Sequence, residues 1–348
     1  MILARLATEA GFPPSVVSVV HGTRPTVEYL SGERGIKAVS FVGSSVVGRQ
    51  VWAKCTGAGK RVQCNLAAKN HCVVMPDAHV NSTVNAIVGA AFGAAGQRCM
   101  ALSVCVIVDE PRGQLTTEWI SKLCHRSRML VVGPGSDPVT DVGPLITREA
   151  VTRAKDAITT SLLQGGIIEL DGRTVEVQTH QLGNFLGPTI MSNVSPDMPV
   201  YEEELFAPVL SVIRVDTLSE AIALINANPY GNGASIFTTS GANARKFQFE
   251  IEAGQVGVNV PIPVPLPFFS WTGNKGSSLG DLGFYGKSAI SFFTETKVNK
   301  HTVLSPTKNN QTQHITDSHM TSNAQTVVSK WSIHDASETK PDGTMPRH

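Results

Sequence analysis

The sequence predicts an α/β protein in which helices cover a parallel sheet. Short β-branched or apolar runs alternate with helical segments, and glycine or proline stands at the turns between them. The succession of strand, glycine-containing turn, helix and strand is typical of βαβ units. Hydrophobic residues make up 41% of the 348 residues. At about 100–200 residues per domain, this length suggests about two domains.

The N-terminal part supplies the first elements of this pattern. Apolar residues at helical spacing predict an amphipathic helix over 2–10, which Gly11 and Pro13 end. Strands are expected over residues 15–22, 36–44, 61–68 and 72–77, with a helix over 46–54.

The middle of the chain continues the alternation. An Ala/Gly/Val segment over 80–96 predicts a buried helix, and Thr147 is expected to cap a helix that runs to Leu163. A long Gly/Pro loop over 133–146 is of the kind that is often functional or interdomain. Further helices are expected over 114–128, 216–227 and 242–253, and strands over 102–110, within 166–215 and 228–238, and over 255–260. Residues 304–348 are polar and predict a disordered tail.

Charge and cysteine content exclude several classes of function. The net charge of +1 indicates no nucleic-acid partner. No run of about 18 apolar residues is present, so no membrane span is expected, and the N-terminus lacks the basic region of a signal peptide. The six cysteines show no CxxC pair and no metal-ligand spacing with histidines. We therefore expect free thiols, a reducing compartment and no metal site.

One cysteine has the surroundings of a nucleophile. Cys99 lies between a helix of small residues and the apolar run that begins at Leu102, within GAAGQRCMALSVCV (93–106). Small neighbours allow a substrate close to the sulfur, and Arg98 would favour the thiolate by lowering a pKa near 8.5. A thiolate can attack an aldehyde, and the Cys99 N–H could stabilise the oxyanion that forms. The alternative is a buried structural cysteine, which is the interpretation we give the other five.

Five ordered motifs resemble the aldehyde dehydrogenase superfamily over residues 1 to about 300. They are FVGSSVVG (41–48), GQRC (96–99), EELFAPV (203–209), NPYGNGASIFT (228–238) and GQVGVNVPIPVPLPFFSWTG (254–273). Two stretches, NLAAKNHCVVMPDA (65–78) and the proline-rich run at 260–267, resemble the CoA-acylating methylmalonate-semialdehyde branch.

The resemblance implies a role for each motif residue. Cys99 is the expected nucleophile. The turn with Phe41, Gly43 and Ser44 would lie against NAD, with Ser44 at the pyrophosphate, as suits a residue before a helix N-terminus. Glu204 would bind the nicotinamide ribose and Phe206 would pack near the nicotinamide. Seen alone, Ser44 could equally be a plain N-cap. Without the family, a solvated carboxylate would be the better interpretation of Glu204 and a core aromatic that of Phe206.

Arg98 has a second expected role, because guanidinium groups recognise carboxylates through paired hydrogen bonds. The resemblance implies a short aldehyde substrate that carries a carboxylate, and we expect Arg98 to contribute to its binding. His71 receives no catalytic role, because a surface or packed histidine is the simpler interpretation.

Three positions depart from the common pattern of the superfamily. Asn65 stands where hydrolytic members have a glutamate that activates water. Asn cannot accept a proton at neutral pH, so a thioester would survive for attack by CoA. Ala67 and Ala207 replace glycines, and their methyl groups could crowd the cofactor if the backbone there needs a positive φ.

The expected architecture is aldehyde dehydrogenase-like: a partial Rossmann-type NAD domain and an α/β catalytic domain. We expect the rest of the NAD domain over 1–68, the catalytic domain over 69–275, a return segment and oligomerisation strand over 276–303, and the tail over 304–348. The family's chain begins well before the position of Met1, so the resemblance implies an N-terminal truncation. The segment 291–300 resembles the arm that joins neighbouring subunits, which implies a homo-oligomer.

The expected function is NAD-dependent oxidation of methylmalonate or malonate semialdehyde, with CoA as co-substrate, to propionyl-CoA or acetyl-CoA. The resemblance implies a mitochondrial location. A catalytically dead relative that associates with full-length subunits is the alternative. A hydrolytic enzyme that does not use CoA is a third possibility, against which Asn65 argues.

Overall fold

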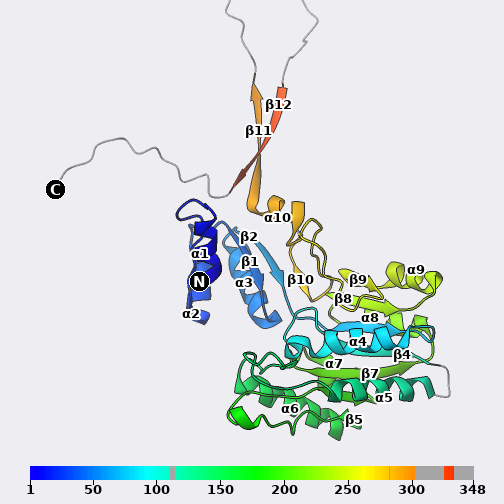
Figure 1. Cartoon of the computed structure of the whole chain (residues 1–348). Coiled ribbons are helices and arrows are strands. Elements are labelled where there is room, and N and C mark those ends of the chain that lie inside the picture. Colours follow the sequence, from blue (N-terminus) through cyan, green and yellow to red (C-terminus); the bar gives the residue numbers. More distant parts are fainter. Residues whose placement is uncertain (110–113, 282, 302–324, 333–348) are drawn as a thin grey trace, which may run out of the picture.

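Two sheets of unequal size make up the body of the protein, and a two-stranded ribbon extends from it (Figure 1). The computed structural model describes residues 1–109, 114–281, 283–301 and 325–332. The α/β class predicted from the sequence is confirmed.

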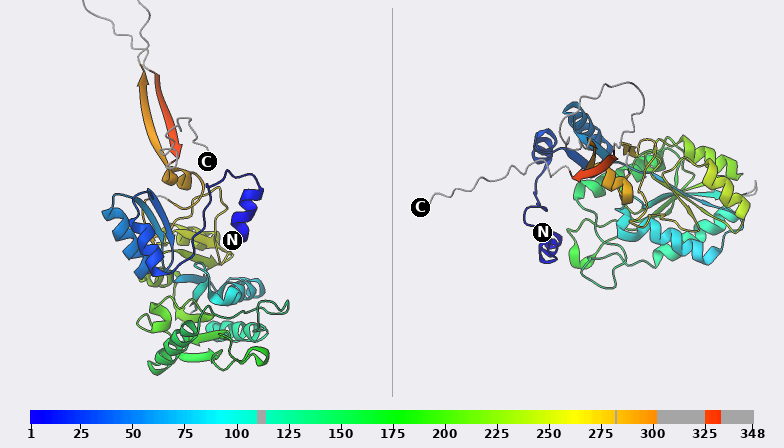
Figure 2. Two further views of the ribbon diagram at one scale, coloured as in Figure 1. Left: turned by 90° about the vertical axis from the view of Figure 1, so that its left-hand side faces the viewer. Right: turned by 90° about the horizontal axis from the view of Figure 1, so that it is seen from above.

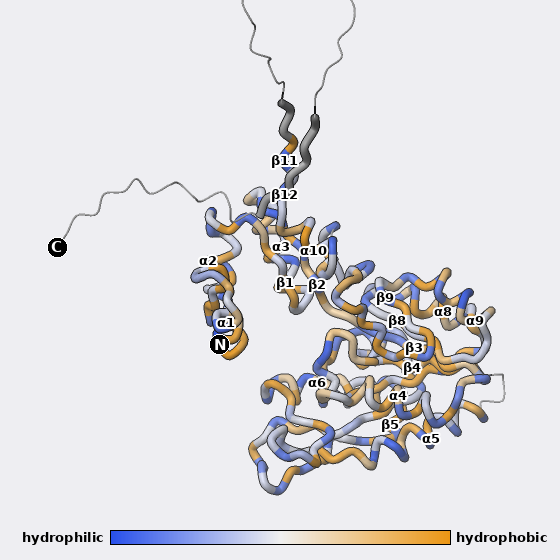
Figure 3. Tube along the Cα trace, turned by 45° about the horizontal axis from the view of Figure 1, so that its top comes forward, coloured by the Kyte–Doolittle hydropathy of each residue, from blue (hydrophilic) through white to orange (hydrophobic). Residues whose placement is uncertain are grey.

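The larger sheet has seven strands in the order β5-β6-β7-β4-β3-β8-β9, and all are parallel except the edge strand β5. Most residues of the central strands β4 and β7 are hydrophobic (Figure 3), as expected for strands buried on both faces. The strands are β3 (Asn70–Val74), β4 (Leu102–Val108), β5 (Ile167–Leu170), β6 (Thr189–Ser192), β7 (Val209–Val215), β8 (Gly233–Phe237) and β9 (Gln255–Val258).

Helices cover both faces of this sheet (Figure 2). Two of them, α4 (Val80–Phe92) and α5 (Gln114–Arg128), pack together on one face, and α8 (Leu218–Ala227) and α9 (Gly241–Glu250) pack on the other. The remaining helices of this part are α6 (Arg148–Leu163), the short α7 (Pro199–Glu202), and the 3-10 turns η1 (Gly93–Gly96) and η2 (Gln178–His180).

The smaller sheet contains the parallel pair β1 (Ala38–Val42) and β2 (Arg61–Asn65), with β10 (Ser278–Leu279) antiparallel to β2. Helices α2 (Arg24–Gly32) and α3 (Ser45–Gly57) pack against each other beside it. Gly48 allows α3 close to the sheet, because a Cβ there would lie 2.1 Å from Leu66 Cδ2. The crossover from β2 to β3 connects the two sheets.

The ribbon follows α10 (Gly286–Phe293) and pairs β11 (Thr294–His301) with β12 (Gln325–Ser332) in antiparallel register. It extends away from both sheets (Figure 1). Most of the predicted tail, 304–348, lies outside the described residues. The structure differs from the expectation of disorder at 325–332, because the backbone of that stretch pairs with β11. The domain limits at 68, 275 and 303 stay predictions.

The strand predicted over residues 15–22 is wrong. The chain there has no regular structure, and Val16, Val17, Val19 and Val20 are exposed. β-branched residues favour strands through packing on a sheet, and none of the described strands pairs with this segment. The preceding helix α1 (Ile2–Glu9) forms where expected but buries none of its residues.

Several helix limits are confirmed. The predicted range of α5 is that of the structure, and the Thr147 hydroxyl accepts the Ala150 N–H at the start of α6. At α8 the cap is Thr217, one residue later than expected. The helix predicted over 80–96 ends at Phe92, because Ala94, Ala95 and Gly96 have positive φ values of 51°, 53° and 70°.

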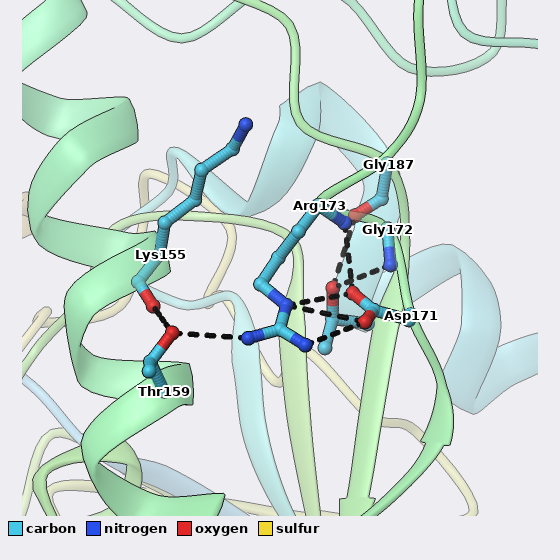
Figure 4. Close-up of polar contacts among 7 residues, drawn as sticks. Lys155, Thr159, Asp171, Gly172, Arg173 and Gly187 are labelled. Atoms are coloured by element: carbon cyan, nitrogen blue, oxygen red, sulfur yellow. Dashed lines mark hydrogen bonds and ion pairs between the residues drawn. The ribbon is translucent and has the colours of Figure 1, made fainter.

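Polar contacts fasten α6 to the strands at the edge of the large sheet (Figure 4). Arg173 Nη2 lies 2.7 Å from Asp171 Oδ2, and Arg173 Nη1 donates to Thr159 Oγ1 at 3.0 Å. The Thr159 hydroxyl in turn donates to the Lys155 carbonyl within the helix. The guanidinium group lowers the pKa of Asp171. These contacts help to fix the orientation of α6, which carries Arg153.

Among the described residues, no helix has the length and apolar character needed to cross a membrane. In the same part of the chain, no cluster of three or more His, Cys, Asp or Glu side chains is placed to hold a metal ion.

Substitution of Gly96 by alanine is expected to destabilise the protein. Gly96 has a φ of +70°, and a Cβ there would lie 2.2 Å from the Ala207 carbonyl oxygen. The strained backbone and the displaced carbonyl should together lower the free energy of unfolding by about 1–3 kcal/mol. Urea unfolding measures this change.

Gly89→Ala is the matched control, because Gly89 lies in α4 with open space around its Cβ position. Alanine there should leave stability unchanged or raise it by about 0.5–1 kcal/mol. Equal effects of the two substitutions would contradict the contact between Gly96 and Ala207.

Candidate functional site

A pocket of about 410 Å³ lies where the two sheets meet, and it contains Cys99. The turn between β1 and α3, the end of β2, helix α6 and the segment after α7 all contribute to its wall. The lining residues are Val42, Gly43, Ser44, Leu66, Cys99, Arg153, Glu203, Glu204 and Phe206.

The structure therefore brings together Cys99, Gly43, Ser44, Glu204 and Phe206, which come from three separate motifs. Phe41, also a predicted site residue, is not part of the wall. Its ring lies beneath the turn, because a Cβ on Gly43 would be 2.7 Å from Phe41 Cζ. Phe41 thus supports the turn from the protein side.

Arg98 does not line the pocket. Its side chain is exposed, and the guanidinium group lies over Gly93, where a Cβ would be 2.7 Å from Arg98 Nη2. Arg98 was the arginine predicted near the thiol, but the arginine at the pocket wall is Arg153.

All six cysteines lie in the described part of the chain, and Cys99 alone is partly exposed. Burial raises the pKa of the Cys99 thiol, and the carboxylate of Glu204 raises it further. The backbone N–H groups of Cys99 and Met100 act in the opposite direction. Arg98, which was expected to lower this pKa, is not among the groups that shift it, and its guanidinium group lies over Gly93.

Ser44 is the N-cap residue of α3, but its side chain makes no capping hydrogen bond to the described residues. Its hydroxyl is at the pocket wall, beside the first turn of a 13-residue helix. The N–H groups of a first turn lack partners within the helix and favour anions. The neighbouring Ser45 hydroxyl accepts the Ala67 N–H at 3.3 Å, which fixes the end of β2 against α3.

Two hydrogen bonds hold the Glu203–Glu204 segment in place. The Ala68 N–H donates to Glu204 Oε1 at 2.9 Å, and Lys69 Nζ donates to the Glu203 carbonyl at 2.6 Å. Burial raises the pKa of Glu204, against the opposing effects of the Ala68 N–H, Lys69 and Arg153. The carboxylate is thus a fixed and largely buried acceptor.

Lys69 is a site residue that sequence reasoning missed. It is fully buried, and burial lowers its pKa to about 7, although Glu204 and Glu203 oppose the change. Lysine is almost never fully buried unless it is paired. A lysine directly after the apolar run 66–68 was the available signal.

His71 is buried and packed, in agreement with the structural role expected for it. Its ring bonds the Lys69 carbonyl at 2.7 Å and the Tyr201 hydroxyl at 3.2 Å. Burial lowers its pKa to about 3, so the ring is neutral at physiological pH. It connects the start of β3 to α7.

A second pocket, of about 710 Å³, lies between α2 and α3. The first turn of α3 separates it from the Cys99 pocket, since Ser44 lines one and Val46 and Val47 line the other. Sequence reasoning missed both this pocket and α2. Thr23 followed by Pro25, a cap residue before a proline in the first helical turn, was the signal for α2.

The positions that depart from the family pattern lie close to the pocket. Asn65 is buried on β2, next to the lining residue Leu66, and its Oδ1 has no hydrogen-bond partner among the described residues. Neither Ala67 nor Ala207 has a positive φ. The backbone at these two positions therefore imposes no requirement for glycine.

The comparisons with known proteins agree with this geometry. The model of the aldehyde dehydrogenase family matches residues 1–299. The chain is 52% identical over 297 residues to a mitochondrial acylating methylmalonate-semialdehyde dehydrogenase of Arabidopsis thaliana. That match covers 85% of this chain and 48% of the relative.

Two solved structures named as methylmalonate-semialdehyde dehydrogenases have the same fold. One, from Sinorhizobium meliloti and complexed with NAD, has a TM-score of 0.82 at 38% identity and covers 95% of this chain and 61% of its own. The other, from Oceanimonas doudoroffii, has a TM-score of 0.82 at 43% identity, with coverages of 84% and 60%.

The chain spans about half the length of the curated relatives it matches. The family model nevertheless covers most of this chain, and its motifs converge on one pocket. The chain therefore belongs to the aldehyde dehydrogenase family.

Proposed function

We propose that this chain oxidises malonate or methylmalonate semialdehyde to an acyl-CoA, with NAD as oxidant and Cys99 as nucleophile. The observation that carries the proposal is the single pocket that contains Cys99, Ser44, Glu204 and Phe206. The names of the relatives support the substrate class and the acylating chemistry.

The residues present fit a dinucleotide. The uncapped first turn of α3 offers N–H groups and the Ser44 hydroxyl to a pyrophosphate. The buried carboxylate of Glu204 offers an acceptor to a ribose hydroxyl, and Phe206 offers an apolar surface to a flat ring. On the other side of the turn, the valines of the second pocket suit a purine. NAD, when bound, accepts the hydride released from the substrate.

The chemistry assigned to the chain begins at Cys99. Its thiol loses a proton, and the thiolate adds to the aldehyde carbon. The oxyanion is stabilised by the Cys99 N–H. Loss of hydride leaves an acyl group on the sulfur as a thioester. The C–C bond to the substrate carboxylate breaks to release carbon dioxide, and the carbon that keeps the electron pair takes up a proton from water. The CoA thiolate then attacks the thioester carbonyl and displaces the Cys99 thiolate.

Asn65 favours transfer to CoA over hydrolysis. Its side-chain amide cannot accept a proton from water at neutral pH. Its buried Oδ1 can accept a hydrogen bond but cannot act as a general base. The thioester then persists until a better nucleophile than water arrives.

Arg98 is our candidate for the contact to the substrate carboxylate. It is adjacent to Cys99, and its exposed side chain can turn away from Gly93. Bidentate hydrogen bonds to the substrate carboxylate would stabilise the rotated side chain.

The relatives and the ribbon support two further proposals, on assembly and on location. We infer that the chain forms homo-oligomers through the segment 291–300, supported by the extension of β11 away from the body. The mitochondrial names of the relatives support a mitochondrial location.

The second candidate is a catalytically inactive relative that associates with full-length subunits. The coverage of about half of each curated relative favours it. NAD binding separates the two candidates, because only the enzyme requires it.

The first prediction from the proposed function concerns turnover. The purified chain should produce NADH from malonate semialdehyde and NAD in a CoA-dependent way, and Cys99→Ala should abolish the signal because the thioester cannot form. Asn65→Glu, which restores a potential base, should reduce the dependence on CoA. Absorbance of NADH measures all three. Failure of the wild type, while a full-length homologue is active in the same assay, would favour the inactive relative.

The second prediction concerns the pocket between α2 and α3. Val47→Asp should raise the dissociation constant of NAD by about tenfold, or about 1.4 kcal/mol, because a carboxylate would then face the apolar wall and the phosphates. Titration calorimetry measures this. Val139→Asp is the control, because Val139 is exposed and lines neither of these pockets. Equal affinities of the two variants would refute the proposed purine site.

The third prediction concerns pH. Burial lowers the pKa of Lys69 from 10.5 to about 7, so between these values the unfolded chain binds more protons than the folded one. The free energy of unfolding should therefore rise with pH above about 7. The contribution is at most about 1.4 kcal/mol per pH unit, and Lys69→Met should remove it. Urea unfolding at pH 7, 8 and 9 measures the slope.

Lys122→Met is the control for this experiment, because Lys122 is partly exposed on α5 and paired with Glu118. The free energy of unfolding of the Lys122→Met protein should change with pH in parallel with that of the wild type. If the Lys69→Met profile is also parallel to the wild type, Lys69 does not titrate in this window.

A further inference from the structure

We propose that Asn70 and Asn232 are positioning residues that orient the peptide group between Cys99 and Met100, so that its N–H faces the Cys99 sulfur. The inference rests on the proposed role of Cys99 as nucleophile. It assigns a purpose to two asparagines that the proposed reaction does not otherwise use.

Two side-chain amides converge on one carbonyl. Asn70 Nδ2 donates to the Cys99 carbonyl oxygen at 2.9 Å, and Asn232 Nδ2 donates to the same oxygen at 3.0 Å. Asn70 is the first residue of β3, and Asn232 directly precedes β8. Donors from two neighbouring strands therefore fix the direction in which this carbonyl points.

The direction of the carbonyl determines that of the Met100 N–H. Both belong to one planar trans peptide group, in which C=O and N–H point in opposite directions. A carbonyl held toward β3 and β8 leaves the N–H directed to the other side of the peptide. In agreement with this direction, the Met100 N–H lowers the pKa of the Cys99 thiol and so favours the thiolate.

Asn70 is itself held firmly. It is buried, its second N–H donates to the Ala101 carbonyl at 2.9 Å, and its Oδ1 accepts the Gly233 N–H at 3.0 Å. Both donors and the acceptor of its amide are thus in use. A side chain with every polar group bonded has one orientation, which it imposes on the Cys99 carbonyl.

Asn232 acts from the other strand. Its amide also contacts Met100 Sδ at 3.0 Å. Gly233 leaves room for this arrangement, because a Cβ there would lie 2.5 Å from Met100 Cε. The peptide group and the Met100 side chain are therefore held together.

This arrangement compensates for the environment of the thiol. Burial and Glu204 both raise the pKa of Cys99, and Arg98 is not among the groups that lower it. Backbone N–H groups are the donors that remain. Neither asparagine needs to touch substrate for this effect, so both act through the orientation of the peptide.

The test follows alkylation of Cys99 by iodoacetamide from pH 6 to pH 10, with peptide mass spectrometry to separate it from the other cysteines. Asn70→Ala and Asn232→Ala should each move the midpoint upward, and the double variant should move it by about one pH unit. The alkylation rate of the double variant at pH 7 should then fall by about tenfold.

Asn228→Ala is the matched control. Asn228 is also a buried asparagine near β8, and its Oδ1 accepts the Tyr230 N–H at 3.0 Å. A variant that only loosens the fold changes the urea midpoint and leaves the alkylation midpoint unchanged, as expected for Asn228→Ala. The same behaviour of Asn70→Ala and Asn232→Ala would overturn the proposal.

Two features keep the test decisive. If Asn70→Ala does not fold, Asn232→Ala carries the test, because Asn232 Oδ1 has no partner among the described residues and less is lost. Alkylation requires neither NAD nor aldehyde. A wild type without turnover overturns the proposed function, whereas an unmoved alkylation midpoint overturns only the inference about the asparagines.

Discussion

The crossover from β2 to β3 is the constraint on which the site depends. It runs from the small sheet to the large one, and its Ala68 N–H and Lys69 ammonium bond Glu204 and Glu203. The two residues that follow bond the Cys99 carbonyl and Tyr201. Four consecutive residues thus fix the Glu204 carboxylate and the Cys99 backbone relative to each other. The pocket is a consequence of this short segment more than of either sheet.

Burial sets the electrostatics of the pocket. It raises the pKa of Cys99 and Glu204 and lowers that of Lys69, so each group is moved toward its neutral form. Backbone dipoles and hydrogen-bond partners within the protein favour the charged forms instead. Backbone N–H groups lower the pKa of Cys99, the Ala68 N–H donates to Glu204, and the Glu203 carbonyl accepts a hydrogen bond from Lys69. The charge of the exposed Arg153 also lowers the pKa of Glu204, whereas Arg98 is not among the groups that shift these pKa values.

Local signals and family motifs predicted much of the fold and most of the pocket. Helices with clear caps, such as α6, were found because capping is decided within one turn. Gly43, Ser44, Cys99, Glu204 and Phe206 were identified because their motifs are contiguous. Lys69 was missed because its partner lies 134 residues away. The strand predicted over residues 15–22 was wrong because propensity does not reveal whether a neighbouring strand exists. The orientation of the Arg98 side chain depends on its contact with Gly93, which the spacing of residues in the sequence does not predict.

The central claim is that the thiol and the cofactor share one pocket. It is tested most directly by the iodoacetamide alkylation rate of each of the six cysteines, measured by mass spectrometry with and without saturating NAD. The account predicts that NAD changes the rate at Cys99 and leaves the five buried cysteines unaffected. An unchanged rate at Cys99, or equal changes at all six, would contradict it.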